Sequence, residues 1–458
     1  MFHSFNALSP LDGRYVSKVT ELSGYFSESA LIRYRVLIEV EWLIHLCNTA
    51  KLPNTRKLET KEVRELRKLY RSWDEDGEQA QAVKDIESIT NHDVKAVEYF
   101  VKENMEKSTM SDLLEMVHFA CTSEDINNLS YSLMMRDAMD EVMIPTLEEM
   151  VESLRNLATK GRTIPMLSHT HGQPASPTTV GKEVTNVMVR LLMQIEQLKD
   201  QPYLGKINGA VGNWNAHIVA YPEVDWIKES RKFIEKLGLI PTLFTTQIEP
   251  HDFIAETAHN LVRINNIILD FDRDMWTYIG KNYFGQKLKE GEIGSSTMPH
   301  KVNPIDFENS EGNLGLANAM LSHLAEKLPI ARMQRDLTDS TVQRNLGVAF
   351  GYSLLAYQSS LKGLSKVSIN KEILLADLDK HWEVLAEPVQ TVMRRYKIPK
   401  PYEKLKKLTR GKGLDQKRYQ AFVKKLEIPA RAKNKLLKLT PATYIGLAKE
   451  LVTLELDL

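Results

Sequence analysis

The chain is poor in cysteine and has no excess of either charge. Only two of its 458 residues are cysteines, Cys47 and Cys121. Two thiols cannot build a disulfide framework or a cysteine zinc site, and they are typical of a protein kept in a reducing cytoplasm. Lysine and arginine together number 60, as do aspartate and glutamate, so no overall field attracts nucleic acid or an acidic membrane surface. Any anion-binding site must therefore be local.

A secretory leader and a long apolar run are also missing. Residues 1–10 lack a basic segment followed by an apolar one, so no signal peptide is expected. The longest uncharged stretch of helical character, residues 345–361, contains two glycines, Tyr352 and Gln358. It predicts a buried helix rather than a membrane span. We therefore expect a cytoplasmic protein whose partners include neither a membrane nor a nucleic acid.

Helical periodicity dominates the sequence, whereas the strict alternation of strands is scarce. Apolar residues recur every three to four positions in long segments, which predicts an all-α fold built on a helix bundle. Several apolar stripes are broader than one bundle needs, so part of them is expected to be buried against other subunits. Pro145 should kink or restart its helix, and residues 205–220 should form a short hairpin or a structured loop. The predicted long helices are 142–157, 184–198, 254–275, 313–331 and 340–361.

The chain is too long for a single compact core and should divide into two or three domains. Helices before about residue 110 are shorter than those that follow, and the sequence after about residue 366 is basic and irregular. We therefore predict an N-terminal helical domain (1–112), a central domain with the long-helix bundle (113–365) and a C-terminal helical domain (366–458).

Two polar clusters lie in the N-terminal part. Residues 12–15, Asp-Gly-Arg-Tyr, form a turn with one cation and one phenol, a combination that usually lies on the surface. In residues 90–93, Asn91 is predicted to be a helix N-cap, with Asp93 favourably placed in the first turn. This cap leaves His92 unexplained.

A third cluster begins at Cys121. Thr122 with Asp125 resembles a capping box, in which Asp replaces the usual Glu. The simplest interpretation is a helix cap and nothing more. The functional alternative is that the same hydroxyls and amides bind an anion at a helix N-terminus.

A fourth cluster, residues 168–174, contains His169 and His171. Neither an HExxH helix nor a pair of cysteines accompanies them, so a metal site is not indicated. A loop histidine beside Gly and Gln is better suited to proton transfer near neutral pH, although a single loop histidine is more often structural.

A fifth cluster, residues 335–344, combines two arginines with hydroxyls. Thr338 or Asp339 can cap the following helix, on which Ser340 and Arg344 lie one turn apart. With Arg335 they make a plausible phosphate-binding site at a helix N-terminus. A salt-bridged helix start explains the same residues equally well.

The most informative stretch is residues 294–304, Gly-Ser-Ser-Thr-Met-Pro-His-Lys-Val-Asn-Pro. Two hydroxyls follow a glycine, and Lys301 and Asn303 come shortly after them. Such a loop suits removal of a proton next to a carboxylate, where growing negative charge needs waiting donors. The alternative is an ordinary polar loop, because Gly, Ser, Pro and Asn all favour turns.

Together these clusters resemble the fumarase/aspartase superfamily of lyases, whose members share a loop of the form GSSxMPxKxNP. The resemblance covers essentially the whole chain. Within the superfamily, residues 90–93, 122–125, 170–174 and 338–341 match the branch that acts on succinylated purine nucleotides. Fumarases and aspartases usually carry Gly at the position of His300, and argininosuccinate lyases usually carry Gln. His169 departs from the pattern, because related lyases commonly place Arg there.

The resemblance implies a three-domain, nearly all-helical subunit. Its central five-helix bundles would assemble into the twenty-helix core of a homotetramer, with each active site drawn from three subunits. It also implies elimination of fumarate from small-molecule nucleotide substrates without any cofactor or metal, because the leaving nitrogen can be protonated as it departs. Two alternatives are another fumarate-releasing lyase, such as an argininosuccinate lyase, and an inactive relative with a structural role.

The same resemblance implies a role for individual residues. Ser295 would remove the proton from the succinyl β-carbon, and His171 would protonate the leaving nitrogen. Lys301 and Asn303 would hold the carboxylate that gains charge. The implied substrate-binding residues, of which Arg335, Ser340 and Arg344 chiefly receive the phosphate, are Arg14, Tyr15, Asn91, His92, Asp93, Thr122, Ser123, Gln247, Ser296, Lys301, Val302, Asn303, Asn309, Arg335, Ser340, Thr341, Val342, Gln343 and Arg344.

Overall fold

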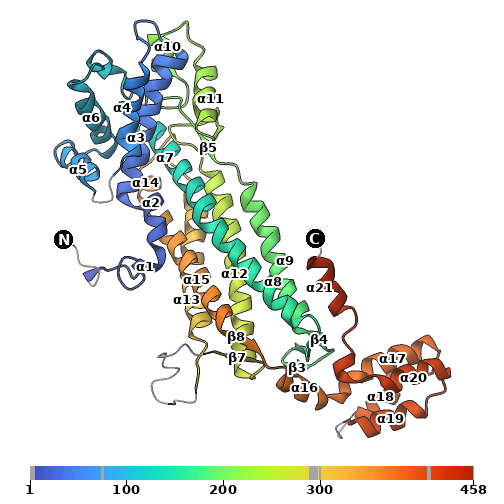
Figure 1. Cartoon of the computed structure of the whole chain (residues 1–458). Helices are drawn as coiled ribbons and strands as arrows, with labels where there is room; N and C mark the ends of the chain where they lie inside the picture. Colours follow the sequence, from blue (N-terminus) through green and yellow to red (C-terminus); the bar gives the residue numbers. More distant parts are fainter. Residues whose placement is uncertain (1–5, 74–76, 288–297, 299–300, 410–413, 457–458) are drawn as a thin grey trace. The chain divides into compact units, whose positions relative to one another are not determined.

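The computed structural model describes residues 6–73, 77–287, 298, 301–409 and 414–456, and its regular structure is mainly helical (Figure 1). The sheets in these residues are four pairs of short strands. The all-α fold predicted from the periodicity is therefore confirmed. The chain forms two compact units, each assembled from three stretches. Unit 1 comprises Met1–Leu147, Gln194–Asn266 and Gly312–Gln358, and unit 2 comprises Glu148–Met193, Ile267–Glu311 and Ser359–Leu458.

Five long helices contribute residues to both units, and they fall on the segments predicted from apolar periodicity. Among the described helices, none has the length and apolar character that a membrane crossing requires. The five are α8 (Ile144–Gly161), α9 (Val180–Lys199), α12 (Asp252–Gly280), α13 (Ile305–Lys327) and α15 (Leu346–Lys366).

One of these predictions was wrong, because the expected helix 340–361 is divided in two. A short helix, α14 (Thr338–Gln343), ends before α15 begins. The carbonyl of Asn345 accepts hydrogen bonds from the amides of Val348 and Ala349, so α15 starts from this residue. Asparagine is a favoured residue at helix starts, which explains the break.

The helix is interrupted near Pro145, where a kink or a restart was predicted, but it does not restart. α7 (Ser123–Ala138) runs into a π-helical turn, η5 (Met139–Met143), before α8 begins. The Ile144 amide donates to the Met139 carbonyl, so the helix continues through this turn. Pro145 follows directly and cannot donate a backbone hydrogen bond, which accounts for the local change of helix type.

Buried polar side chains fix the packing of α12, α13 and α15 in each unit. In unit 1, the amide nitrogen of Asn265 donates to Asn318 at 3.0 Å and to Ser353 at 3.2 Å. In unit 2, the hydroxyl of Ser360 donates to Asp272 and lies 2.9 Å from the Ser310 hydroxyl. Because a buried polar group is costly without its partner, these contacts specify one alignment of the three helices.

Shorter helices complete unit 1 around an apolar core. α3 (Glu28–His45) presents Ile32, Val36, Val40 and Leu43 to this core at helical spacing. The remaining elements are α1 (Val16–Val19), η2 (Thr20–Leu22), α2 (Ser23–Phe26), η3 (Leu46–Ala50), α4 (Thr60–Arg71), α5 (Glu78–Thr90), α6 (Asp93–Glu106), η4 (Ser111–Met116), β5 (Leu204–Gly205), α10 (Asn215–Ala220), α11 (Trp226–Lys236) and β6 (Ile240–Pro241).

The hairpin considered for residues 205–220 is not formed. β5 instead pairs in parallel with β6, and residues 215–220 are helix α10. A parallel pair needs a long crossover connection, which α10 and α11 supply.

Unit 2 adds short strand pairs and a C-terminal group of helices. The second apolar core of the protein lies in this unit and includes Leu378, Trp382, Met393 and Tyr419. The elements are β1 (Pro165–Met166), β2 (His169–Thr170), β3 (Gln173–Pro174), β4 (Thr178–Thr179), β7 (Phe284–Gln286), β8 (Val367–Ile369), α16 (Lys371–Asp379), η6 (Trp382–Leu385), α17 (Ala386–Arg395), α18 (Pro401–Thr409), α19 (Gln416–Lys424), α20 (Ala430–Lys438), η7 (Pro441–Thr443) and α21 (Ala448–Leu456).

The division into three consecutive domains stays a prediction. Two observations support it: one apolar cluster lies within residues 32–117, and another lies almost wholly within residues 378–436.

Candidate active site

The N-terminus of α7 forms the predicted capping box. Thr122 is the N-cap, its side chain accepts from the Asp125 amide, and Asp125 Oδ2 accepts from the Thr122 amide at 2.8 Å. Asp125 is fully buried and also contacts Lys206, with Nζ 3.0 Å from Oδ1. The backbone amide of Asn208 donates to the same oxygen at 3.0 Å. This carboxylate therefore fixes the helix end that carries Thr122 and Ser123.

The segment before α14 is held by an aspartate that the sequence argument did not choose. Asp336 Oδ1 accepts from the Thr338 amide at 2.8 Å, and Oδ2 accepts from the Arg332 amide at 2.9 Å. The predicted cap at Thr338 or Asp339 is therefore wrong, and Asp336 holds the helix start instead. Asp339 accepts from the Ser340 amide at 2.7 Å and is buried.

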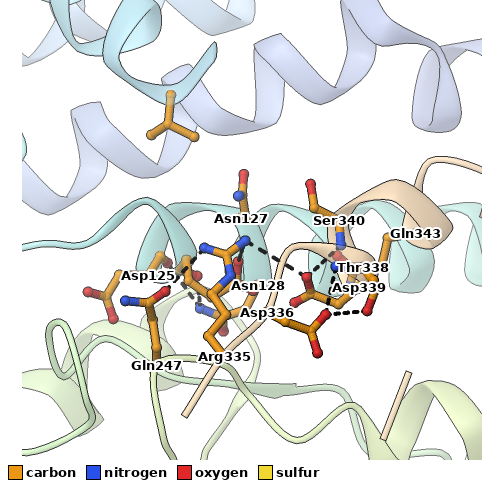
Figure 2. Close-up of polar contacts among 12 residues, drawn as sticks. Asp125, Asn127, Asn128, Gln247, Arg335, Asp336, Thr338, Asp339, Ser340 and Gln343 are labelled. Carbon is orange, nitrogen blue, oxygen red and sulfur yellow. Dashed lines mark hydrogen bonds and ion pairs between the residues drawn. The ribbon is translucent and has the colours of Figure 1, made fainter. Parts of the chain in front are cut away.

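Arg335 reaches between Gln247 and Asp339, as Figure 2 shows. Nη1 donates to Gln247 Oε1 at 3.3 Å. Nη2 lies 3.5 Å from Glu124 Oε2 and 3.9 Å from Asp339 Oδ1. Neither Glu124 Oε1 nor Arg335 Nε has a hydrogen-bond partner within the described part of the chain. The guanidinium is thus held by several incomplete contacts rather than by a closed bidentate pair, which leaves it able to bind an anion.

Buried ionisable groups surround His251, whose backbone adopts a left-handed φ of 64°. His251 Nε2 lies 3.8 Å from Asp339 Oδ2, and Nδ1 lies 3.8 Å from Glu249 Oε2. Burial raises the pKa of Glu124 to about 7 and also raises the pKa of Glu249. Ligand atoms of Glu124, His251 and Asp339 lie within 4.8 Å of one another. A cation would suit this group, and the guanidinium of Arg335 already supplies positive charge beside both carboxylates.

Arg344 closes α14 and pairs with two carboxylates. Nη1 lies 2.8 Å from Glu28 Oε2, and Nη2 lies 3.0 Å from Asp93 Oδ2. Asp93 also pairs with the buried Arg35 at 2.8 Å. Arg344 is therefore salt-bridged, as the alternative interpretation of this cluster predicted, but at the end of α14 and not at a helix start. An anion that binds Arg344 must therefore compete with Glu28 and Asp93.

The predicted cap at Asn91 was wrong. Asn91 closes α5 in the left-handed conformation, with φ 51°. His92 caps α6, because its Nδ1 accepts from the Lys95 amide at 3.1 Å. Only two residues separate α5 from α6. Asn91 lies at the left-handed C-cap position of α5, a conformation that asparagine tolerates well. Since Nδ1 is an acceptor, neutral His92 carries its proton on Nε2.

His171 sits at the tip of the β2–β3 hairpin. Thr170 pairs with Gln173, so His171 and Gly172 form a two-residue turn with φ values of 54° and 71°. Positive φ at both positions defines a type I′ turn, in which Asn, Asp and Gly are preferred and a histidine is strained. The imidazole is exposed. Backbone strain of this kind is found at functional sites, which supports His171 as a reacting group.

His169, the departure from the superfamily pattern, contacts Lys281 in unit 2. Lys281 Nζ lies 3.0 Å from His169 Nε2. Burial and the Lys281 charge lower the pKa of His169. A neutral His169 can accept from the lysine, so it orders the strand that leads to His171.

The remaining unit 2 candidates lie around the start of α13. The Val302 carbonyl accepts from Gln286 at 2.9 Å, and Asn309 accepts from the Ser359 hydroxyl at 2.8 Å. Lys301 is exposed. The predicted base Ser295 and its neighbour Ser296 lie outside the described residues.

The candidate residues divide between the two units, and within unit 1 the structure joins Gln247 to Arg335. Glu124, His251 and Asp339 form a cluster in unit 1 that was not predicted from the sequence. No periodicity marks a buried histidine in a loop. Arg14 lies over the Tyr15 ring at 5.7 Å. Unit 1 holds Arg14, Tyr15, Asn91, His92, Asp93, Thr122, Ser123, Gln247, Arg335, Ser340, Thr341, Val342, Gln343 and Arg344, and unit 2 holds His171, Lys301, Val302, Asn303 and Asn309.

Family comparisons establish the class of protein. A family model described as Lyase matches residues 13–320, and a model described as Adenylosuccinate lyase C-terminal matches residues 331–445. The fold is similar to that of the solved 3-carboxy-cis,cis-muconate lactonizing enzyme from Pseudomonas putida, with a TM-score of 0.75 over 96% of both chains at 19% identity. The helical fold and the family match together define a lyase, as residues 294–304 predicted.

Curated relatives narrow this class to one family. The adenylosuccinate lyases of Haemophilus influenzae and of Escherichia coli K12 are each 56% identical to this chain over 450 residues, which is 98% of both sequences. The chain belongs to the adenylosuccinate lyase family.

Proposed function

We propose that this lyase eliminates fumarate from adenylosuccinate, giving AMP, and from the succinylcarboxamide ribotide SAICAR, giving AICAR. The observation that carries the proposal is the end-to-end match to adenylosuccinate lyases, over 98% of each sequence. The two guanidiniums at the ends of α14 suit a nucleotide phosphate. They favour a nucleotide over argininosuccinate as the substrate.

The chemical step needs a base, an acid and a stabilised carboxylate. Ser295 takes the proton from the succinyl β-carbon, and the released electron pair forms the double bond of fumarate as the C–N bond breaks. His171 gives a proton to the departing nitrogen, and its place on an exposed turn supports this role. Lys301 and Asn303 stabilise the carboxylate that gains charge. Serine is a weak base, so Lys301 and loop amides are its expected activators.

Substrate binding is assigned to the groups gathered in unit 1. Thr122 and Ser123 bind the succinyl carboxylates at the N-terminus of α7, where first-turn amides lack acceptors within the helix. Arg335, Ser340 and Arg344 bind the phosphate. The other residues named from the sequence contact the rest of the nucleotide.

We also propose that the active form is a homotetramer in the cytoplasm, with active sites shared between subunits. Three long helices leave large apolar side chains at least half exposed, among them Met193 at 61%, Trp276 at 52% and Leu316 at 51%. A separate cavity of about 950 Å³ in unit 1 is lined by apolar groups that include the highly exposed Phe244 and Met333. Exposed apolar surface of this kind supports burial against other copies.

One assay tests the function. Purified protein is mixed with adenylosuccinate, SAICAR or argininosuccinate, and fumarate release is followed together with the nucleotide absorbance. We expect turnover of the first two substrates and none of the third. Turnover of argininosuccinate alone, or of none of them, would contradict the proposal. Light scattering after size exclusion tests the tetramer separately.

A further inference from the structure

Two buried carboxylates beside Arg335 have no role in the function proposed so far. Glu124 is 1% exposed and Asp339 is 2% exposed. One oxygen of Glu124 has no hydrogen-bond partner within the described residues. Burying an ionisable carboxylate with so few partners destabilises a fold. A role in holding Arg335 would account for the buried position of Glu124.

The guanidinium of Arg335 is the point where three segments meet. Glu124 comes from the first turn of α7, Gln247 from the loop before α12, and Asp339 from α14. A free arginine side chain loses rotamer entropy when it is fixed. Contacts that fix it before the substrate arrives reduce this loss on binding.

We propose that Glu124 and Asp339 are positioning residues that hold Arg335, beside Gln247, in place for the phosphate of the nucleotide. This inference rests on the proposed function, in which Arg335 binds that phosphate. Glu124 directly follows Ser123, which is assigned to the succinyl carboxylates. The same helix end thereby sets both the succinyl contacts and, through Glu124, the phosphate contact.

Glu124→Gln is the central test, because it keeps the shape of the side chain and removes its charge. We expect KM for adenylosuccinate at pH 8 to rise about tenfold, as after loss of a charged contact, with kcat within twofold. The thermal midpoint should rise, because a buried charge with an unpaired oxygen is gone. A purely structural carboxylate would give the opposite pattern, with a lower midpoint and an unchanged KM. A KM that falls would also overturn the proposal, because Glu124 would then compete with the phosphate.

Glu249→Gln is the matched control. Glu249 is buried in the same cluster, but its carboxylate contacts His251 rather than Arg335. We expect its thermal midpoint to rise like that of Glu124→Gln, while KM stays within twofold. An equal rise of KM in both variants would attribute the effect to the cluster as a whole and contradict the specific role of Glu124.

A double-mutant cycle separates failure of this inference from failure of the proposed function. Arg335→Ala should raise KM, and adding Glu124→Gln should then raise it by less than twofold, because the group being positioned is gone. If Arg335→Ala leaves KM unchanged in an enzyme that cleaves adenylosuccinate, the phosphate assignment of Arg335 is wrong. If Arg335→Ala raises KM but Glu124→Gln multiplies it fully in both backgrounds, only the positioning role is wrong.

The pH dependence gives an independent readout. The charged groups that face Glu124 are His251, Arg335, Asp339 and Lys206. Since burial raises the pKa of Glu124 to about 7, its carboxylate loses charge as the pH falls through this value. The KM of the unmodified enzyme should therefore rise below about pH 7 towards that of Glu124→Gln. Comparing the two enzymes cancels the titration of the substrate phosphate, and parallel profiles would contradict the proposal.

Discussion

The two units hold their candidate residues in opposite ways. In unit 1, Arg335 and Arg344 are surrounded by carboxylates, some of them fully buried. In unit 2, His171 stands on an exposed turn and Lys301 is exposed. The groups assigned to binding are thus fixed by the fold before any substrate arrives. The two described groups assigned to the chemistry, His171 and Lys301, are exposed in the single chain.

The two arrangements also destabilise the protein in different ways. Around Arg335 in unit 1 the cost is desolvation of charge, which depends on pH and on the loss of partners. At His171 in unit 2 the cost is backbone strain, of about 1 kcal/mol for a non-glycine residue in the left-handed region. Substitutions should therefore separate binding, turnover and stability according to the unit in which they are made.

The largest expected effect is on turnover in the unit 2 group. Ser295→Ala should lower kcat by at least about 10²-fold, the usual contribution of a positioned base, with little change in substrate binding. Single-turnover kinetics and equilibrium binding would be measured side by side. Near-normal turnover would mean that another residue takes the proton.

His171→Asn should lower kcat to a similar extent while raising the thermal midpoint slightly, because asparagine relieves the strain of the turn. Asparagine is preferred in a type I′ turn, so the hairpin keeps its shape but loses its proton donor. The matched variant His171→Ala should lose the same activity without the gain in stability, because alanine carries the same left-handed strain as histidine, about 1 kcal/mol. If His171→Asn remained active, the acid would lie elsewhere, with His92 the next candidate.

A smaller effect is expected from the unit 1 arginines. Arg335→Ala and Arg344→Ala should each weaken nucleotide binding by about 2 kcal/mol, seen mainly in KM, because a charged hydrogen bond is lost. The control is a substrate without the phosphate. The unmodified enzyme should use it poorly, and the variants should lose little more on it. An equal loss on both substrates would return these arginines to a structural role.

Stability against pH tests whether buried charge is costly in unit 2 as well. Burial raises the pKa of Asp272 to about 8. A carboxyl group whose pKa is raised on folding stabilises the protein at low pH, and this contribution is lost as the pH rises through about 8. Asp272→Asn should therefore raise the thermal midpoint at pH 9 by a few degrees and change it little near pH 4. Equal shifts at both pH values would show that charge is not the cause.

The smallest effect is expected at Glu28, which pairs with Arg344 on the exposed side of unit 1. Exposed pairs contribute at most about 1 kcal/mol. Glu28→Gln removes a competitor for Arg344, so KM should fall, by no more than about fivefold. The variant Glu28→Gln with Arg344→Ala should show no such gain. A rise in KM would instead make Glu28 a positioning residue, like Glu124.

Much of this fold follows from periodicity, and the errors are local. The long helices and the capping box at Thr122 were predicted, because apolar spacing and cap chemistry are properties of short segments. Helix ends were less certain. Asn91 and His92 form the junction of two helices, and both residue types suit a cap, so sequence alone does not say which helix each one serves. Asn345 was similarly overlooked within an apolar run that reads as one helix.

The same difference between local sequence signals and long-range packing applies to the candidate site. Motif resemblance selected Ser295, His171 and the arginines as candidates, because a shared reaction constrains the types of its reacting groups. It did not find Glu124, His251 or Asp339 as a cluster, since their association depends on how α7, α12 and α14 pack. A carboxylate in a first helical turn is ordinarily explained by its favourable interaction with the helix dipole. Glu124 was therefore not selected as a candidate from the sequence.

The two-residue turn that carries His171 has an evolutionary consequence. In a β-hairpin, adding one residue to the loop changes the turn type and the register of the strands. An insertion or deletion between Thr170 and Gln173 would thus redirect the imidazole even if every residue of the site were retained. Most surface loops tolerate such length changes well. Divergent members of this family should therefore vary in sequence around the hairpin but keep its length.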